Sequence, residues 1–153
     1  MDIVDLDWQN QLDMLVRVLI ATAAGAAVGY ERELAERPAG LRTHALLGAA
    51  ACLLVVLTDS VIAHFITESA PSLLRTDPVR VIEAIVTGTA FLGAGTIFRN
   101  RKSGVEGLTT AASLLLVAAI GVAVALRQVM LAVMVTLLTL ALLRLANRWV
   151  KNT

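Results

Sequence analysis

The chain has 153 residues, of which 58% are hydrophobic and 16% are charged, and its mean hydropathy is +0.78. Soluble domains carry about 45–50% apolar and about 25% charged residues, so this composition indicates an integral membrane protein. Five spans of about 20 residues occupy roughly 100 positions, which excludes a soluble enzyme domain beside a membrane anchor. The net charge of only +1 forms no basic face, so nucleic-acid binding is not expected.

Five apolar stretches are long enough to cross a hydrocarbon core of about 30 Å. They predict an all-α, polytopic membrane helical bundle with spans at residues 12–30, 45–65, 79–98, 108–126 and 129–146. Most basic residues lie in the loops after the first and third spans and in the C-terminal tail. The positive-inside rule therefore predicts that the N-terminus is outside and the C-terminus is cytoplasmic.

Small residues recur at helical spacing inside the spans. Ala21, Gly25 and Gly29 are four positions apart in the first span, and Ala84 and Gly88 repeat this spacing in the third. Helices in lipid associate largely through close backbone approach at such residues. We expect these residues to form packing grooves, either within the chain or between copies. The large lateral surface of five short helices favours a homo-oligomer, most simply a dimer.

Three ionisable side chains inside the spans are predicted to share one depth. Arg17, Asp59 and Glu83 each lie about 7–9 Å inside the outer boundary at a rise of 1.5 Å per residue. Because an ionisable group inside a span is unfavourable without a partner, we expect them to meet in one outer-leaflet charged cluster. This cluster is either a salt-bridge network between three helices or an entry site for a cation or proton. Only Glu83 and Asp59 are candidate metal ligands.

A second polar layer is predicted where four spans end at the cytoplasmic side. Its members are Glu31, Arg32, Arg42, Thr43, Gly93, Gly95, Thr109 and Thr110. The starts of the second and fourth spans present unsatisfied N–H groups and positive dipole ends, which favour an anion or a carboxylate. Glu31 is the nearest internal carboxylate. Either Glu31 and Arg42 cap and pair the helix ends, or this layer binds a ligand or partner.

Three stretches of the sequence carry a family signature. GYERE…RPAGLRTHALLGAAA, DPVRVIEAIVTGTAFLGAGTIF and GVEGLTTAASLLLVAAIGV closely resemble the N-terminal membrane domain of the bacterial MgtC/SapB family, over residues 17–121. The family motif falls on Glu31, Arg32, Gly40, Leu41, Arg42, Thr43, Gly88, Phe91, Leu92, Gly93, Ala94, Gly95, Gly107, Leu108, Thr109 and Thr110. The resemblance implies one transmembrane domain over residues 1–153, without the soluble C-terminal domain that several members carry.

The resemblance also implies a multi-pass protein of the bacterial inner membrane that is linked to magnesium homeostasis, acid tolerance or virulence. One hypothesis is a modulator that binds another membrane protein, such as a transporter or the F-type ATP synthase. A second is a transporter or channel that passes Mg²⁺ or another cation by way of Glu83 and Asp59. A third is a purely structural oligomer. The sequence has no phosphate loop, CxxC or HExxH motif, so we expect no enzyme and no cofactor.

Overall fold

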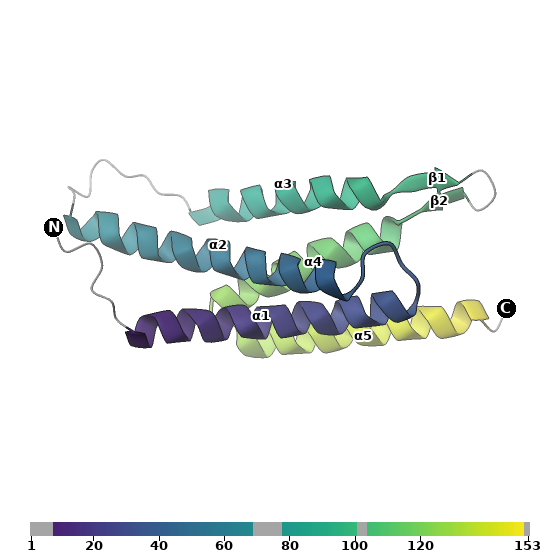
Figure 1. Ribbon diagram of the computed structural model, residues 1–153, viewed down its shortest axis with the longest axis horizontal. Helices are drawn as coiled ribbons and strands as arrows, with labels where there is room; N and C mark the ends of the chain where they lie inside the picture. The colour runs from purple at the N-terminus through teal and green to yellow at the C-terminus, as the bar shows by residue number, and fades with distance from the viewer. Residues whose placement is uncertain (1–7, 69–77, 101–103, 152–153) are drawn as a thin grey trace.

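The computed structural model describes residues 8–68, 78–100 and 104–151. Its five helices are α1 (Trp8–Leu34), α2 (Leu41–Glu68), α3 (Pro78–Thr96), α4 (Leu108–Ala125) and α5 (Val129–Lys151). Their axes run roughly along one direction (Figure 1). Helix α1 starts toward one end of the molecule, and α5 finishes at the other end. The predicted polytopic helical bundle is therefore confirmed, and each predicted span overlaps one helix, although residues 97–98 and Leu126 fall beyond the ends of α3 and α4.

The five helices differ in how well they suit a membrane. Four are long and apolar enough to cross one, over Trp8–Leu34, Leu41–Ile62, Val79–Thr96 and Leu108–Ala125. Within the part of α5 whose side chains are described, the apolar stretch covers Val129–Leu145, and the helix itself continues to Lys151. A stretch of this length lies within the range of about 17–25 residues that spans a bilayer.

A short β-hairpin replaces the loop that the sequence predicts between the third and fourth spans. Strands β1 (Phe98–Asn100) and β2 (Gly104–Glu106) pair antiparallel, with Arg99 opposite Val105. Gly107 then turns the chain into α4 with a φ of 89°, and a Cβ there would collide with the carbonyl oxygen of Thr96. Only glycine fits this turn without strain. The hairpin and the loop between α1 and α2 lie at the same end of the molecule, which we call the hairpin end (Figure 1).

Helix α4 lies at the centre of the bundle and contacts the other four helices. Its buried residues include Leu114, Val117 and Val124, which are at most 1% exposed. The small residues of α1 pack inside the chain: a Cβ on Gly29 would lie 2.7 Å from the carbonyl oxygen of Gly40, and one on Gly25 would collide with the carbonyl oxygen of His44. The α1 stripe therefore packs against α2.

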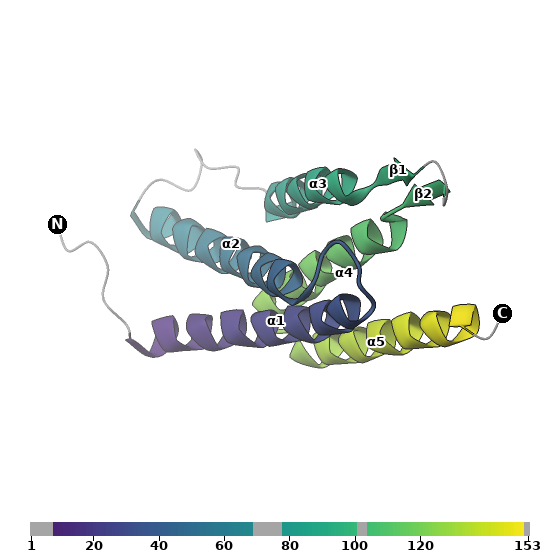
Figure 2. The same cartoon turned by 45° about the vertical axis from the view of Figure 1, so that its right-hand side comes forward.

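The arrangement on α3 is different. A Cβ on Gly88 would meet nothing within 4 Å, and an apolar cavity of about 220 Å³ separates this part of α3 from α2. Residues Leu47, Ala50, Ala84 and Leu92 are among those that line the cavity. Helix α3 lies at the edge of the bundle in both ribbon views (Figures 1 and 2). The Ala84–Gly88 pair thus faces a gap beside α2 and contributes no close helix contact.

Candidate functional site

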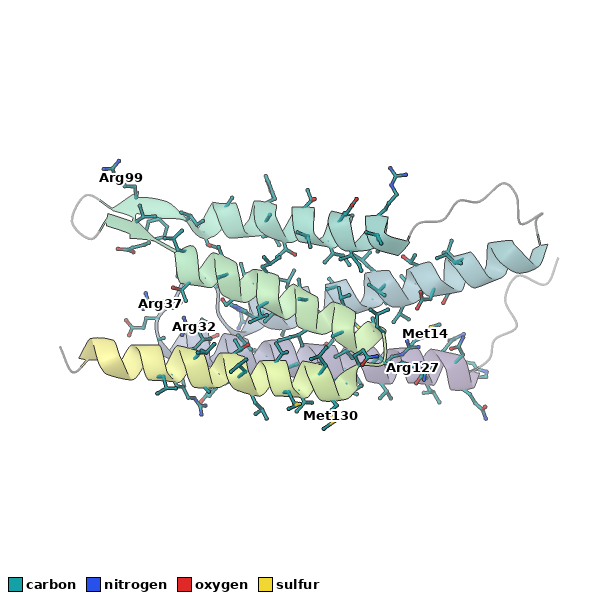
Figure 3. The ribbon with its side chains drawn as sticks, turned by 180° about the vertical axis from the view of Figure 1, so that it is seen from behind. Met14, Arg32, Arg37, Arg99, Arg127 and Met130 are labelled. Atoms are coloured by element: carbon teal, nitrogen blue, oxygen red, sulfur yellow. The ribbon has the colours of Figure 1, made fainter. Side chains whose placement is uncertain are left out.

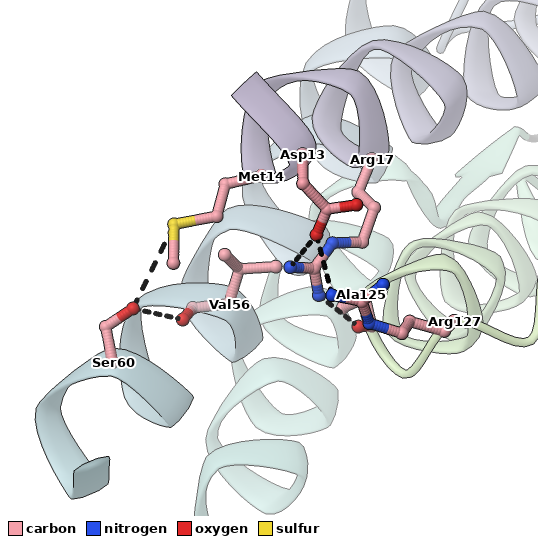
Figure 4. Close-up of polar contacts among 7 residues, drawn as sticks. All are labelled: Asp13, Met14, Arg17, Val56, Ser60, Ala125 and Arg127. Atoms are coloured by element: carbon pink, nitrogen blue, oxygen red, sulfur yellow. Dashed lines mark hydrogen bonds and ion pairs between the residues drawn. The ribbon is translucent and has the colours of Figure 1, made fainter. Parts of the chain in front are cut away.

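The buried arginine of α1 joins the start of that helix to the turn between α4 and α5. Arg17 is 9% exposed, and its Nη1 donates to the carbonyl oxygen of Ala125 at 2.9 Å. Its Nη2 donates to Oδ2 of Asp13 at 2.7 Å, and Nη2 of Arg127 donates to the same oxygen at 2.8 Å (Figure 4). Asp13 thus bridges two arginines, and the free carbonyl at the C-terminal end of α4 receives the third charge-assisted bond.

The predicted outer cluster has a different composition. No hydrogen bond or ion pair joins Arg17 to Asp59 or Glu83 in the described ranges, and both carboxylates are exposed. Asp59 borders a small cavity of about 40 Å³ between α2 and α3, together with Val81 and Ile82. Arg17 pairs with Asp13 because residues four apart on a helix are neighbours, whereas Asp59 and Glu83 lie on other helices. An exposed carboxylate inside a span is unfavourable by up to roughly 2.5–3.5 kcal/mol.

The two charged residues at the end of α1 are buried and paired with each other. Glu31 is 5% exposed and Arg32 is 2% exposed. Nε of Arg32 donates to Oε2 of Glu31 at 2.6 Å, and Nη2 lies 2.6 Å from the same oxygen. The approach of Nη2 gives an ion pair but no well-directed hydrogen bond, so Nη2 stays an unsatisfied buried donor. By contrast, Arg42 and Thr43 are exposed on the first turn of α2.

A carboxylate does occupy the start of α2, but it belongs to Glu33. Its Oε2 accepts the backbone N–H of Leu41 at 2.8 Å, and a Cβ on Gly40 would lie 2.6 Å from that oxygen. A side chain at position 40 would therefore displace the Glu33 carboxylate from its place at the first turn of the helix. The sequence suggested Glu31 for such a contact between a carboxylate and a helix start, but Glu33 makes it.

A buried histidine connects α2 to α4. His44 is 0% exposed, its Nδ1 lies 2.9 Å from the carbonyl oxygen of Gly40, and its Nε2 lies 3.0 Å from Oγ of Ser113. The Ser113 hydroxyl oxygen also lies 2.8 Å from the carbonyl oxygen of Thr110. This chain of contacts ties the loop before α2 to the first two turns of α4, directly beneath the hairpin end.

A polar cavity of about 420 Å³ opens at the hairpin end. It is framed by the loop after α1, the hairpin and the first turn of α4, through Glu36, Arg37, Pro38, Phe98, Val105, Glu106, Gly107, Leu108, Thr109 and Thr110. Gly107 is the residue that caps α4 and it has no side chain, so it offers no acceptor to the first backbone N–H groups of this helix. Figure 3 shows Arg32, Arg37 and Arg99 toward this end, and Arg127 and Met14 farther from it.

The structure brings together only part of the predicted polar layer. Thr109 and Thr110 line the cavity, whereas Glu31 and Arg32 are buried at the end of α1. Gly93 packs against α4, since a Cβ added to it would lie 3.2 Å from the Cβ of Ala111. Gly95 has open space around it, since an added Cβ meets nothing within 4 Å. The cavity also gains three charged residues that the sequence did not single out, Glu36, Arg37 and Glu106.

Sequence reasoning missed Asp13 and the His44–Ser113 pair. The spacing of Asp13 and Arg17 was itself a signal, because acidic and basic residues four apart on a helix commonly pair. His44 lies between Gly40 and Gly48 at the same four-residue spacing, which places it on the face that packs against α1. No signal in the sequence links His44 to Ser113, which is 69 positions away.

Comparisons with known proteins give one consistent family. Residues 18–152 match the MgtC family. The chain is 38% identical over 128 residues to "Protein MgtC" of Salmonella typhimurium, which covers 82% of this chain and 49% of that protein. It is 36% identical over 112 residues to "Putative magnesium transporter YhiD" of Escherichia coli, covering 73% and 50% respectively. It is 35% identical over 120 residues to "Protein SapB" of Bacillus subtilis, covering 77% and 50%.

These matches cover the relatives only in part. The chain spans about half the length of those three curated relatives. No solved structure matches the fold of this chain.

Proposed function

The chain belongs to the MgtC family, and we propose that it is a bacterial inner-membrane protein that serves magnesium homeostasis or stress adaptation by modulating another membrane protein. The magnesium link is supported by relatives, one of which is named a putative magnesium transporter. We further propose that the N-terminus is outside and that the hairpin end is cytoplasmic. The basic residues Arg37 and Arg99 at that end support this orientation.

The close packing of α1, α2 and α4 is the observation that carries this proposal. A Cβ on Gly48 would lie 2.7 Å from the carbonyl oxygen of Ala21, and one on Gly121 would lie 2.5 Å from that of Gly48. Backbones this close leave no room between these helices for a partly hydrated ion. Mg²⁺ usually keeps several waters when bound, so such packing supports a modulator over a carrier whose path runs between α1, α2 and α4.

The polar cavity at the hairpin end suits a protein partner. It presents carboxylates from Glu36 and Glu106 and a guanidinium from Arg37, beside the first turn of α4. Charges of both signs give an interface orientation and specificity more than raw affinity. We propose this cavity, with Thr109 and Thr110 at its wall, as the place where a partner membrane protein, such as a transporter or the ATP synthase, is recognised.

A flux measurement tests the proposal. Proteoliposomes that contain only the purified protein should take up no more Mg²⁺ than protein-free vesicles at equal lipid. In cells that depend on the protein for growth in low magnesium, Arg37→Glu should lose complementation while its membrane level stays unchanged. The exposed Arg99→Glu, which lies at the same end of the molecule but outside the cavity lining, is the matched control and should complement. Mg²⁺ uptake by the wild-type vesicles would refute the modulator function.

The second candidate is a cation transporter or channel that uses Asp59 and Glu83. It is favoured by the exposure of both carboxylates within helices that are apolar enough to span, and by the printed name of the YhiD relative. This candidate predicts uptake by the purified protein that falls at least tenfold in Glu83→Gln or Asp59→Asn. No catalytic role is part of either proposal.

A further inference from the structure

Helix α3 is the least covered of the four helices that can span a membrane. In Val79–Thr96 only 17% of the apolar window is buried, against 28% in α1, 33% in α2 and 50% in α4. Phe91 is 81% exposed. The views in Figures 1 and 2 agree that α3 is an edge helix with open space on its outer side. A large part of this helix therefore faces lipid or another protein.

The buried positions of α3 define which face is turned outward. Ile85 is 7% exposed and Thr89 is 2% exposed, and Gly93 faces Ala111 of α4, so these three positions mark the inner face. With 3.6 residues per turn, the positions on the other side repeat at intervals of three and four. They are Arg80, Glu83, Thr87, Ala90, Phe91 and Ala94, all exposed, and we call them the α3 outer stripe.

The stripe has the composition of a contact between membrane helices. Ala90 and Ala94 are small, and the hydroxyl of Thr87 is already satisfied, because it donates to the carbonyl oxygen of Glu83 at 2.8 Å. Small residues at such spacing let two helix backbones approach closely in lipid. A spacing of three and four residues is also that of the seam between two paired helices.

Two opposite charges stand at one end of the stripe. Arg80 and Glu83 are one turn apart, and neither side chain has a hydrogen bond or ion pair to any part of the chain that the structure describes. Glu83 lies within the apolar window of α3. An ionisable group there is expected to have a partner, and this chain supplies none in the described ranges.

A second copy of the chain supplies both charges at the right depth. In a dimer whose two-fold axis is normal to the membrane, equivalent residues of two facing α3 helices lie at equal depth. Arg80 of one copy then stands only three residues, or about 4.5 Å along the axis, from Glu83 of the other. An arginine side chain spans that offset. The symmetry repeats the contact, so one arginine and one glutamate give two reciprocal ion pairs.

We propose that the α3 outer stripe is the contact surface between two copies of this chain, joined by reciprocal Arg80–Glu83 ion pairs. Any heterologous partner would need its own arginine and acidic residue at matched depths, whereas a second copy carries them by identity. The interface lies on the edge helix, away from the polar cavity. The proposal therefore stands whether the cavity binds a partner or not.

Charge reversal in differently tagged copies tests the contact. Arg80→Glu gives each copy two negative charges on the stripe, and Glu83→Arg gives each copy two positive charges. Ala90→Cys is added in each case as a crosslinking probe, because the native Cys52 is buried. In lipid bilayers, each single reversal should lower the disulfide-linked dimer fraction at least tenfold relative to the Ala90→Cys protein. Asp59→Asn, which changes an exposed carboxylate of α2, should leave that fraction unchanged.

Two combinations separate a charge contact from simple misfolding. Copies with Arg80→Glu mixed with copies with Glu83→Arg should crosslink to one another, and the double variant R80E/E83R should regain crosslinking with itself. Failure of both combinations to crosslink, or full crosslinking by both single reversals, would overturn the proposal. The proposal would also be overturned if the wild-type protein stayed monomeric in bilayers and Glu83→Arg abolished its binding to a different membrane protein.

Discussion

Buried charges in this protein are mostly compensated by groups close to them in space. Asp13 accepts hydrogen bonds from both Arg17 and Arg127, and Glu31 neutralises Arg32. Arg127 has a φ of 62°, a left-handed conformation that is uncommon outside glycine. This conformation places the Arg127 guanidinium beside Asp13, and the contact holds the turn between α4 and α5 against α1.

Asp13→Asn tests the bridge between the two arginines. The amide keeps the shape of the side chain but removes the charge that faces Arg17 and Arg127. Because the carboxylate is 38% exposed, solvent screens part of the interaction, and we expect a loss of about 1 kcal/mol. The measurement is the thermal unfolding midpoint in detergent, which should fall more than in Asp59→Asn. Equal midpoints for the two variants would show that the bridge contributes nothing.

Ser113→Ala tests the link between α2 and α4. Removing the hydroxyl leaves Nε2 of the fully buried His44 without its partner, and an unsatisfied buried group costs about 1–3 kcal/mol. Ser60→Ala is the control, since the Ser60 hydroxyl bonds to the carbonyl oxygen of Val56 on its own helix and makes only a long contact of 4.0 Å with Sδ of Met14 on α1. Chemical denaturation in mixed micelles should show a lower midpoint for Ser113→Ala than for Ser60→Ala. The reverse order would contradict the link.

Helix positions in the bundle centre are set by glycine contacts. Gly25 and Gly29 of α1 meet the backbone of α2, and Gly121 of α4 meets Gly48 and Ala51 of α2. Three helices thus share one set of close backbone approaches. Helix α3 has no such contact at Gly88 or Gly95, and it leaves a cavity of about 220 Å³ beside α2. The bundle is therefore tight around α1, α2 and α4 and open along α3.

Gly121→Ala and Gly88→Ala should separate these two regions. The new methyl at position 121 would lie 2.5 Å from the carbonyl oxygen of Gly48, so α2 and α4 must move apart and the protein should be markedly destabilised. The methyl at position 88 meets nothing within 4 Å, and alanine favours a helix over glycine by up to about 1 kcal/mol. The yield of protein after size-exclusion chromatography should fall for Gly121→Ala and stay unchanged for Gly88→Ala. A stable Gly121→Ala protein would argue against the packing described here.

The topology of the whole molecule depends on α5. With five crossings the two termini lie on opposite sides of the membrane, whereas four crossings would place them on the same side. The chain places the start of α1 and the end of α5 at opposite ends of the bundle, which agrees with five crossings (Figure 1).

Reporter fusions after residue 153 decide the orientation. We expect green fluorescent protein fused there to fluoresce and alkaline phosphatase fused there to be inactive, because the C-terminus is proposed to be cytoplasmic. A phosphatase fused after Glu68, in the connection before α3, should be active. Active phosphatase at the C-terminal fusion would show that α5 does not cross or that the whole bundle is inverted.

The sequence by itself determined the number and place of the helices. Hydropathy is a local property of the sequence, and in lipid each spanning segment must form its own backbone hydrogen bonds. The hydropathy pattern alone therefore places α1 to α5. Pro78 likewise marks the start of α3, because its missing N–H costs nothing at the first helical position. The three family motifs, read without any coordinates, already identified the MgtC family.

Only the tertiary structure decided which polar groups meet. The sequence predicts that Arg17 contacts Asp59 and Glu83, yet its long-range partner is the carbonyl oxygen of Ala125, which is 108 positions away. Depth in the membrane follows from counting residues along one helix. The rotation of each helix and its neighbours depend on packing among all the helices, so the sequence placed the charges in layers while the fold assigned their partners.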